Sequence, residues 1–325
     1  MTSAAISESA LNLCSQRLLF AGRSVVLKTN CPRVAGYAAD FLQEDDRTES
    51  AWSPASATIT VHVHESREPV HAAPWFRARG HFAFARFTRS DSFWFNLRTR
   101  EVYGVCSSAL ANDRRRWQVH IFPALLGILS AVIEVAPLHA ACVVGDGGGI
   151  LLTGHSGAGK STLSIALGRR GYSVLSDEWT YLSAAGRGLT AWGLPVPIKL
   201  LPDAVRFYPE LLDHQPADCL NGETAYEVFP EEFLGVSRQM SCSLNTIILL
   251  DRALEPRCDV TAISAQEAIA HLKAEMEPLE GSLACAYNRQ LDLIERLADA
   301  SCLRVSFNAP PAEVAEALDV VLTPA

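Results

Sequence analysis

Residues 150–162 read ILLTGHSGAGKST. An apolar run that predicts a buried strand at 150–153 leads into a segment that predicts a helix at 160–170. Between them, Gly154, Gly159, Lys160 and Ser161 fit the pattern GxxxxGK[ST]. Glycines let successive backbone N–H groups turn toward phosphate oxygens, and the helix N-terminus adds the positive end of its dipole. The pattern therefore predicts a loop that binds a nucleoside triphosphate, ATP above all.

Each polar group of this loop has an expected role. The Lys160 ammonium would neutralise the β- and γ-phosphates, and the Ser161 hydroxyl would be a ligand of Mg²⁺. A glycine-rich turn without chemical function is the alternative, but chance matches seldom fall between a strand and a helix. The predicted nucleotide-binding residues are Gly154, His155, Ser156, Gly157, Ala158, Gly159, Lys160, Ser161 and Thr162.

Two acidic residues, Asp177 and Glu178, follow the next apolar strand, predicted at 172–176. The ligands of α/β sheets bind at the carboxyl ends of the strands, so both acids are expected beside the glycine-rich loop. Glu178 is the expected second partner of Mg²⁺, directly or through water. The alternative is a pair of ordinary polar residues at a strand end. His139, in an otherwise apolar strand, is by itself more typical of a buried structural histidine.

Beyond residue 111 the sequence alternates between strands and helices. The turn at 146–149 joins two strands as a hairpin. The strand, loop, helix and strand between 150 and 176 form a βαβ unit, which predicts a largely parallel sheet covered by helices. Ser264 and Glu267 form a capping box that opens a helix. The other expected elements are helices at 118–134 and 286–299, strands at 138–144, 246–250 and 303–307, and a helix that starts at Pro310-Pro311.

Residues 1–110 predict a smaller, antiparallel β-rich domain. In one of its strands Ile59, Val61 and Val63 share a face, while His62 and His64 lie on the other. A solvated strand face is favoured for the two histidines over a metal-binding edge, because the sequence positions no third ligand. The aromatic residues expected in the core of this domain, rather than on a stacking platform, are Trp75, Phe76, Phe82, Phe84, Trp94 and Phe95.

Composition narrows the class of protein. The chain has 325 residues and a net charge of −8, which argues against nucleic-acid binding because sequence-independent attraction to phosphate backbones needs a basic surface. Its nine cysteines show no metal-binding spacing, so free thiols and a cytoplasmic location are expected. No signal peptide is expected at the N-terminus. The longest apolar run, residues 121–133, is too short to span a membrane, so no membrane association is predicted.

Taken together, the segments Leu-His-Ala at 138–140, TGHSGAGKSTL at 153–163 and Ser-Asp-Glu at 176–178 resemble the core of HPr kinase/phosphorylase and related bacterial kinases. The resemblance covers about residues 137–183. It implies an α/β fold with a P-loop kinase core of the HPr kinase/phosphoenolpyruvate carboxykinase type. It also implies catalytic roles for His139, Lys160 and Asp177, with Asp177 accepting the proton of the substrate hydroxyl. The family commonly has Asp-Asp where this sequence has Asp177-Glu178.

The resemblance implies an ATP- and Mg²⁺-dependent kinase that phosphorylates a hydroxyl group, above all a serine in a peptide or protein. Two alternatives stay open, a small-molecule kinase and a nucleotide-gated binding protein that transfers no phosphoryl group. Residues 111–325 are the expected catalytic domain, and residues 1–110 are expected to recognise the acceptor. The sequence leaves homo-oligomer formation open.

Overall fold

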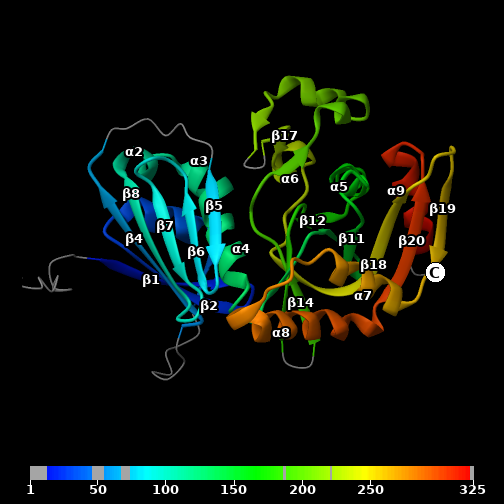
Figure 1. Ribbon diagram of the computed structural model, residues 1–325. Helices are drawn as coiled ribbons and strands as arrows, with labels where there is room; N and C mark the ends of the chain where they lie inside the picture. Colours follow the sequence, from blue (N-terminus) through cyan, green and yellow to red (C-terminus); the bar gives the residue numbers. More distant parts are fainter. Residues whose placement is uncertain (1–12, 46–54, 67–73, 186–187, 220–221, 323–325) are drawn as a thin grey trace, which may run out of the picture. The chain divides into compact units, whose positions relative to one another are not determined.

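The computed structural model describes residues 13–45, 55–66, 74–185, 188–219 and 222–322. The chain forms two compact units, Met1–Ile133 and Glu134–Ala325 (Figure 1). The sequence-based boundary at residue 110 differs from this division, which assigns the apolar helix after residue 121 to the first unit. The expectation that the chain lacks a signal peptide rests on residues 1–12, which lie outside the described ranges.

The first unit contains a sheet and several helices. Its elements are β1 (Cys14–Phe20), β2 (Arg23–Thr29), α1 (Pro32–Phe41), β3 (Gln43–Glu44), β4 (Ala57–His64), β5 (Trp75–Arg79), β6 (Phe82–Arg86), β7 (Ser92–Asn96), β8 (Glu101–Ser107), α2 (Ser108–Ala111), α3 (Arg114–Arg116), a π-helical turn (Trp117–Ile121) and α4 (Phe122–Ser130). The described strands are ordered β3-β1-β2-β4-β8-β7-β6-β5.

This sheet is mixed, which corrects the prediction of an antiparallel domain. β4 pairs in parallel with β2 and with β8, whereas the other neighbours are antiparallel. The physical reason is a crossover, because α1 lies between β2 and β4 in the chain and packs against β1 and β2. Among the described residues no third metal ligand lies with His62 and His64.

The apolar segment after residue 116 belongs to the core of this unit. Trp117 is fully buried, and its ring lies 6.1 Å from that of Phe93 on β7 and 5.1 Å from that of Phe122 on α4. Leu125 and Leu129 are also fully buried. These contacts explain why the helix predicted at 118–134 groups with the N-terminal sheet.

Most aromatic residues predicted in the core lie on the open face of the sheet instead. Phe95 is buried, but Trp75, Phe82 and Trp94 are between 41% and 55% exposed. Phe76 is 42% exposed although it lies on the inner face, where it pairs with Ala85 and its ring contacts that of Phe87. Phe84 is half-buried, and its ring lies 5.4 Å from that of Trp94. The reason is the twofold alternation of a strand: Phe93 and Phe95 of β7 point inward, so Trp94 between them must point outward.

The second unit alternates strands and helices. Its elements are β9 (Ala136–Leu138), β10 (Ala141–Gly145), β11 (Gly148–Thr153), α5 (Lys160–Gly168), β12 (Ser173–Ser176), β13 (Thr180–Ala185), β14 (Gly188–Trp192), β15 (Ile198–Leu200), 3₁₀ turns (Pro202–Arg206 and Pro209–Asp213), β16 (Ala217–Asp218), β17 (Thr224–Val228), α6 (Pro230–Phe233), β18 (Ser241–Arg252), β19 (Cys258–Ala262), α7 (Ala265–Ala274), a 3₁₀ turn (Gly281–Leu283), α8 (Ala284–Glu295), a 3₁₀ turn (Arg296–Asp299), β20 (Ser301–Phe307) and α9 (Pro311–Leu322).

The main sheet of this unit is mixed, which corrects the prediction of a largely parallel sheet. Its described strands are ordered β12-β10-β11-β18-β14-β13-β9, and β20 pairs with β18. β11, β18 and β20 are parallel, but the hairpin predicted around 146–149 places β10 antiparallel between β11 and β12. The two strands of the βαβ unit, β11 and β12, are therefore not neighbours in the sheet, because β10 lies between them. The strand predicted at 138–144 is likewise broken at His139 into β9 and β10.

Helices cover both faces of the sheet (Figure 1). On β11, Ile150 and Leu152 pack into a cluster with α5 and α9, while Leu151 packs into a second cluster with α7 and α8. The Ser264 side chain caps α7 by accepting the N–H of Glu267 at 3.2 Å, as the capping box predicts. α9 begins at Pro311, as predicted. The unit is a mixed α/β structure.

Two further predictions can be compared with the structure. All nine cysteines are described, and all are free thiols, as expected. Within the described ranges, no helix combines the length and the apolar character needed to cross a membrane.

Candidate functional site

Residues 154–159 connect β11 to α5 through a tight turn that only glycine fits at two points. Gly154 has a φ of 150°, and a Cβ there would lie 2.6 Å from the carbonyl oxygen of Leu250 on β18. Gly159 precedes α5 with a φ of 100°. No side chain caps the N-terminus of α5, so its first N–H groups are available to an anion.

Lys160, the first residue of α5, is buried and folds back on this loop. Its Nζ donates to the carbonyl oxygens of Gly154 at 2.8 Å and His155 at 3.4 Å. Burial lowers the pKa of Lys160, and the carboxylates of Asp177, Glu275 and Glu178 act in the opposite direction. The ammonium group is therefore held against the loop carbonyls, where these three carboxylates act on its charge.

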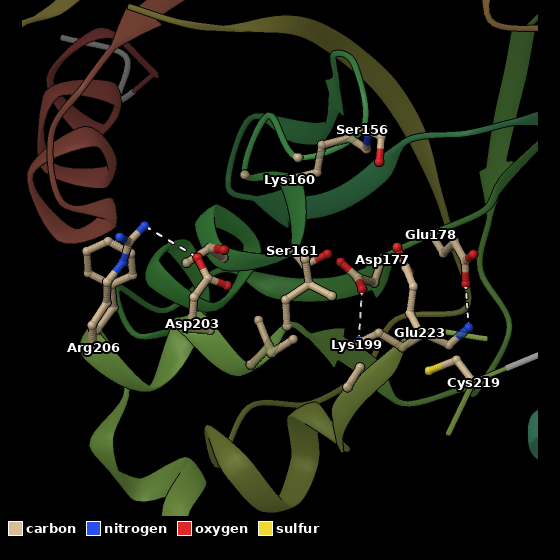
Figure 2. Close-up of a pocket in the computed structure, with 18 of the residues that line it drawn as sticks. Ser156, Lys160, Ser161, Asp177, Glu178, Lys199, Asp203, Arg206, Cys219 and Glu223 are labelled. Atoms are coloured by element: carbon tan, nitrogen blue, oxygen red, sulfur yellow. Dashed lines mark hydrogen bonds and ion pairs between the residues drawn. The ribbon is translucent and has the colours of Figure 1, made fainter. Parts of the chain in front are cut away.

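Asp177 follows β12 and is buried beside the start of α5. Its side chain and that of Ser161 point toward one another (Figure 2). Oδ2 accepts the backbone N–H of Lys199 at 3.1 Å, whereas Oδ1 is buried without a hydrogen-bond partner. Burial raises the pKa of Asp177 to about 6, against the effects of the Lys199 N–H and the nearby Ser161 hydroxyl. The carboxylate thus has one oxygen available to a ligand.

Glu178 points in a different direction from Asp177 (Figure 2). Its Oε2 accepts a hydrogen bond from Lys199 Nζ at 2.8 Å. Although burial works against the charged amine, the Glu178 carboxylate raises the pKa of Lys199. The two neighbouring acids are therefore both at the sheet edge, as predicted, but Asp177 is the one that lies beside Ser161.

His139 occupies the break between β9 and β10 and lines the same pocket as Lys160. It is half-buried, and its ring lies 5.5 Å from that of Trp179. Burial, and then the charge of Lys160, lower the pKa of His139, which favours a neutral imidazole near pH 7. The histidine singled out from sequence is thus part of the pocket wall.

The pocket gathers most of the residues predicted from sequence. It is lined by the predicted site residues His139, Ser156, Gly157, Gly159, Lys160, Ser161, Thr162, Asp177 and Glu178. Gly154, His155 and Ala158 are not among its lining residues: the loop residues Gly154 and Ala158 are buried, and His155 is exposed.

Two arginines in this pocket were not predicted. Arg252 is the last residue of β18. A Cβ atom added to Gly159 would lie 2.9 Å from the Arg252 guanidinium, so the guanidinium lies close to the loop. Arg206 ends a 3₁₀ turn and forms an ion pair with Asp203 at 3.5 Å. Burial, and then Arg206, lower the pKa of Arg252. Because β18 runs parallel to β11, its carboxyl end had to lie near the loop, so the sequence held a signal for Arg252 but none for Arg206.

No protein-family model matches the sequence, and no curated protein matches it. Among solved structures, the Hpr(Ser) kinase/phosphatase from Coxiella burnetii is similar, with 16% identity over 57% of this chain and 95% of that chain. Its TM-score is 0.29, which establishes neither a shared fold nor a shared activity.

Proposed function

We propose that the protein is an ATP- and Mg²⁺-dependent phosphotransferase that phosphorylates a hydroxyl group, above all a serine in a peptide or protein. The observation that carries this proposal is one pocket that combines Lys160, Ser161 and the half-satisfied Asp177 carboxylate at the open N-terminus of α5. Phosphoryl transfer depends mainly on positioning and on neutralising charge, and this pocket has groups for both.

The cations of the pocket suit a triphosphate. Lys160, Lys199, Arg206 and Arg252 all line it, and the N–H groups at the start of α5 add partial positive charge. For Lys160 to reach a phosphate, its Nζ would exchange the loop carbonyls for phosphate oxygens. Such a change replaces two neutral acceptors by a charged one, which strengthens the hydrogen bonds.

The donor set fits Mg²⁺, which prefers oxygen ligands. Ser161 Oγ and the unpartnered Asp177 Oδ1 lie toward one another, while Glu178 is engaged by Lys199. Ser161 and Asp177 would hold the ion, with Glu178 as a further partner through water if its bond to Lys199 opens. Bound Mg²⁺ would neutralise charge on the transferring phosphoryl group.

Asp177 also suits the role of general base. In the metal-free protein a pKa of about 6 leaves its carboxylate deprotonated at neutral pH and able to accept a proton. Asp177 would orient the acceptor hydroxyl and take its proton as the new P–O bond forms. His139 is neutral, and the charge of Lys160 acts on it. Its imidazole would adjust the electrostatic potential around the phosphates.

The first unit is the proposed site of acceptor selection. Every residue assigned above to the nucleotide, the metal or proton transfer lies in the second unit, Glu134–Ala325. The aromatic side chains exposed on the sheet of the first unit offer a surface for a peptide or protein acceptor.

A labelled-phosphate assay tests the proposal. The protein is incubated with γ-labelled ATP, Mg²⁺ and either cell extract or peptides encoded beside its gene, and label in serine is the expected result. Lys160→Ala should lower transfer by at least about 100-fold, whereas Lys273→Ala is a matched control, because Lys273 pairs with Glu295 outside the pocket. Calorimetry on the same proteins measures binding of ATP with Mg²⁺.

Two outcomes contradict parts of the proposal. Equal transfer by Lys160→Ala and by the parent protein would remove the loop from the mechanism. Tight ATP binding without transfer to any acceptor would instead indicate a nucleotide-gated binding protein, and label in a small molecule would indicate a small-molecule kinase.

A further inference from the structure

A second group of polar side chains lies close to the loop but does not line the pocket. His155, an exposed loop residue, meets His271 and Glu275 at the C-terminal end of α7. The Glu275 N–H donates to the carbonyl oxygen of His271 at 3.2 Å, so the helical turn continues between them. Residues four apart on a helix share one face, which aims both side chains at the loop.

The distances within this group are those of a metal site that needs little adjustment. One ligand atom from each of the three residues lies within 4.8 Å of the other two. His155 Nδ1 lies 3.2 Å from Glu275 Oε1. Ligand atoms bound tetrahedrally at zinc distances are about 3.4 Å apart. The first pair is therefore already close to that spacing, and the ligand atom of His271 lies within 4.8 Å of both.

One ring nitrogen of His271 is buried without a hydrogen-bond partner. This atom is Nε2, and buried polar atoms nearly always have a partner. The neutral imidazole is the form that binds a metal. A metal ion would supply the missing partner.

We propose that His155, His271 and Glu275 form a binding site for Zn²⁺. Two imidazoles and one carboxylate are donors that suit zinc, whereas Mg²⁺ and Ca²⁺ prefer oxygen alone. Three protein ligands leave the fourth tetrahedral position to water. This site is separate from the proposed Mg²⁺ ligands Ser161 and Asp177, and it does not depend on the proposed phosphotransfer.

The ion would tie the glycine-rich loop to α7. His155 belongs to the loop, and its carbonyl oxygen accepts a hydrogen bond from Lys160 Nζ. Without the metal, the exposed His155 side chain contacts α7 through its Nδ1, which lies 3.2 Å from Glu275 Oε1, and an exposed contact of this kind contributes little in water. Coordination would replace that weak contact by three metal–ligand bonds, one from the loop and two from the end of α7. Bound zinc should therefore reduce the mobility of residues 154–159.

Zinc titration of the chelator-treated full-length protein tests the site. Competition with a chromophoric chelator should show one tight site in the parent protein. His155→Ala and His271→Ala should each weaken it by at least about tenfold. His214→Ala is the matched control, because His214 is an exposed histidine of the same unit outside the cluster and should leave the affinity unchanged. Circular dichroism checks the fold, and His155→Ala, on an exposed loop, decides the matter if His271→Ala does not fold.

Two further measurements separate this site from adventitious binding. The absorption spectrum of the Co²⁺-substituted protein should lack a thiolate charge-transfer band, whereas such a band would move the site to an exposed cysteine such as Cys14 or Cys285. Limited proteolysis within 154–159 should slow on adding Zn²⁺ to the parent protein, but not to His271→Ala. Equal zinc affinity in the parent and both histidine variants would overturn the proposal.

Discussion

Asp177 and Glu178 are adjacent in sequence but have different surroundings. Asp177 is buried beside Ser161 with one unpartnered oxygen, and Glu178 is 40% exposed and paired with Lys199. The structure therefore offers Asp177 for both roles that the sequence divided between the two acids. Only kinetics can divide proton acceptance from metal binding, because the same oxygen could serve either.

We predict that Asp177→Asn lowers phosphoryl transfer by about 10²–10⁴-fold at saturating Mg²⁺, because the amide keeps the shape of the side chain but cannot accept a proton. Glu178→Gln should chiefly raise the Mg²⁺ concentration that gives half-maximal rate. Transfer rates across a Mg²⁺ titration distinguish the two. If excess Mg²⁺ restores Asp177→Asn but not Glu178→Gln, Asp177 is a metal ligand only and the base is Glu178.

A second prediction concerns stability in the absence of nucleotide and metal. Burial raises the pKa of Asp177 from 3.8 to about 6, so the folded state binds its proton more tightly than the unfolded state does. This carboxyl therefore contributes stability below pH 4 that is lost as the pH rises through about 6. Asp177→Asn should thus raise the free energy of unfolding at pH 7.5 by up to about 3 kcal/mol and change it little at pH 4.

Urea denaturation at the two pH values, with a chelator present, measures this difference. The matched control is Asp203→Asn, which removes an exposed carboxylate of the same pocket that is paired with Arg206. A loss of stability in Asp177→Asn at pH 7.5 would mean that the Lys199 N–H and Ser161 outweigh the cost of burying the charge.

For individual residues, the sequence predicts the position of those that belong to a motif. Lys160, Ser161 and Asp177 lie together because their spacing along strand, loop and helix fixes their places. Arg206 comes from a 3₁₀ turn whose position depends on tertiary packing, so no local pattern indicates it. His155 matches the loop motif, yet its side chain turns toward α7, a direction that the motif does not specify.

At the scale of elements, the junction between β11 and the loop is the most constrained point of the site. We predict that Gly154→Ala destabilises the protein by about 3 kcal/mol or more, because its φ of 150° is unfavourable and the new Cβ would meet the Leu250 carbonyl at 2.6 Å. Gly157→Ala is the matched control. Gly157 also has a positive φ, 77°, but no atom lies within 4 Å, so a cost of about 1–2 kcal/mol is expected.

Thermal denaturation of the two variants measures the difference. A Gly154→Ala variant no less stable than Gly157→Ala would show that β18 moves away from the loop without cost. ATP affinity should follow the same order, because only Gly154 sets the direction in which the loop leaves the sheet.

Elements with strong local signals were predicted well, and their partners in the sheet were not. The strand at 150–153, the helix after Lys160 and the cap at Ser264 depend on local sequence, and each appears near its predicted position. Pairing is decided by contacts between distant segments. The hairpin of β10 and β11 was itself predicted. That β10 would lie between β11 and β12 and make the sheet mixed depends on how the whole unit assembles.

For the whole molecule, the division between Ile133 and Glu134 predicts which fragments fold. Residues 134–325 expressed alone should unfold cooperatively and bind ATP with Mg²⁺ as the full chain does. Residues 111–325 should aggregate, because Trp117 and Phe122 would lose their contacts with Phe93 and Phe41 of the first unit.

Calorimetry and size-exclusion chromatography on both fragments check this prediction. If the first unit selects the acceptor, residues 134–325 should also lose phosphorylation of a peptide that the full chain modifies. Unaltered transfer to the same peptide would place acceptor recognition in the second unit.

The central position of β18 gives a direct way to measure nucleotide binding. Between Thr246 and Leu249 this strand is paired on both sides, with β11 and with β20, and Ile247 and Ile248 are fully buried. Amide protons in such a place exchange with deuterium only when the whole unit unfolds, whereas those of the edge strand β19 exchange through local opening. A ligand that binds only the folded unit slows global exchange by the factor 1 + [L]/Kd. Adding ATP and Mg²⁺ should therefore slow deuterium uptake at Ile247 and Ile248 by that factor, which yields the dissociation constant without an assay of activity.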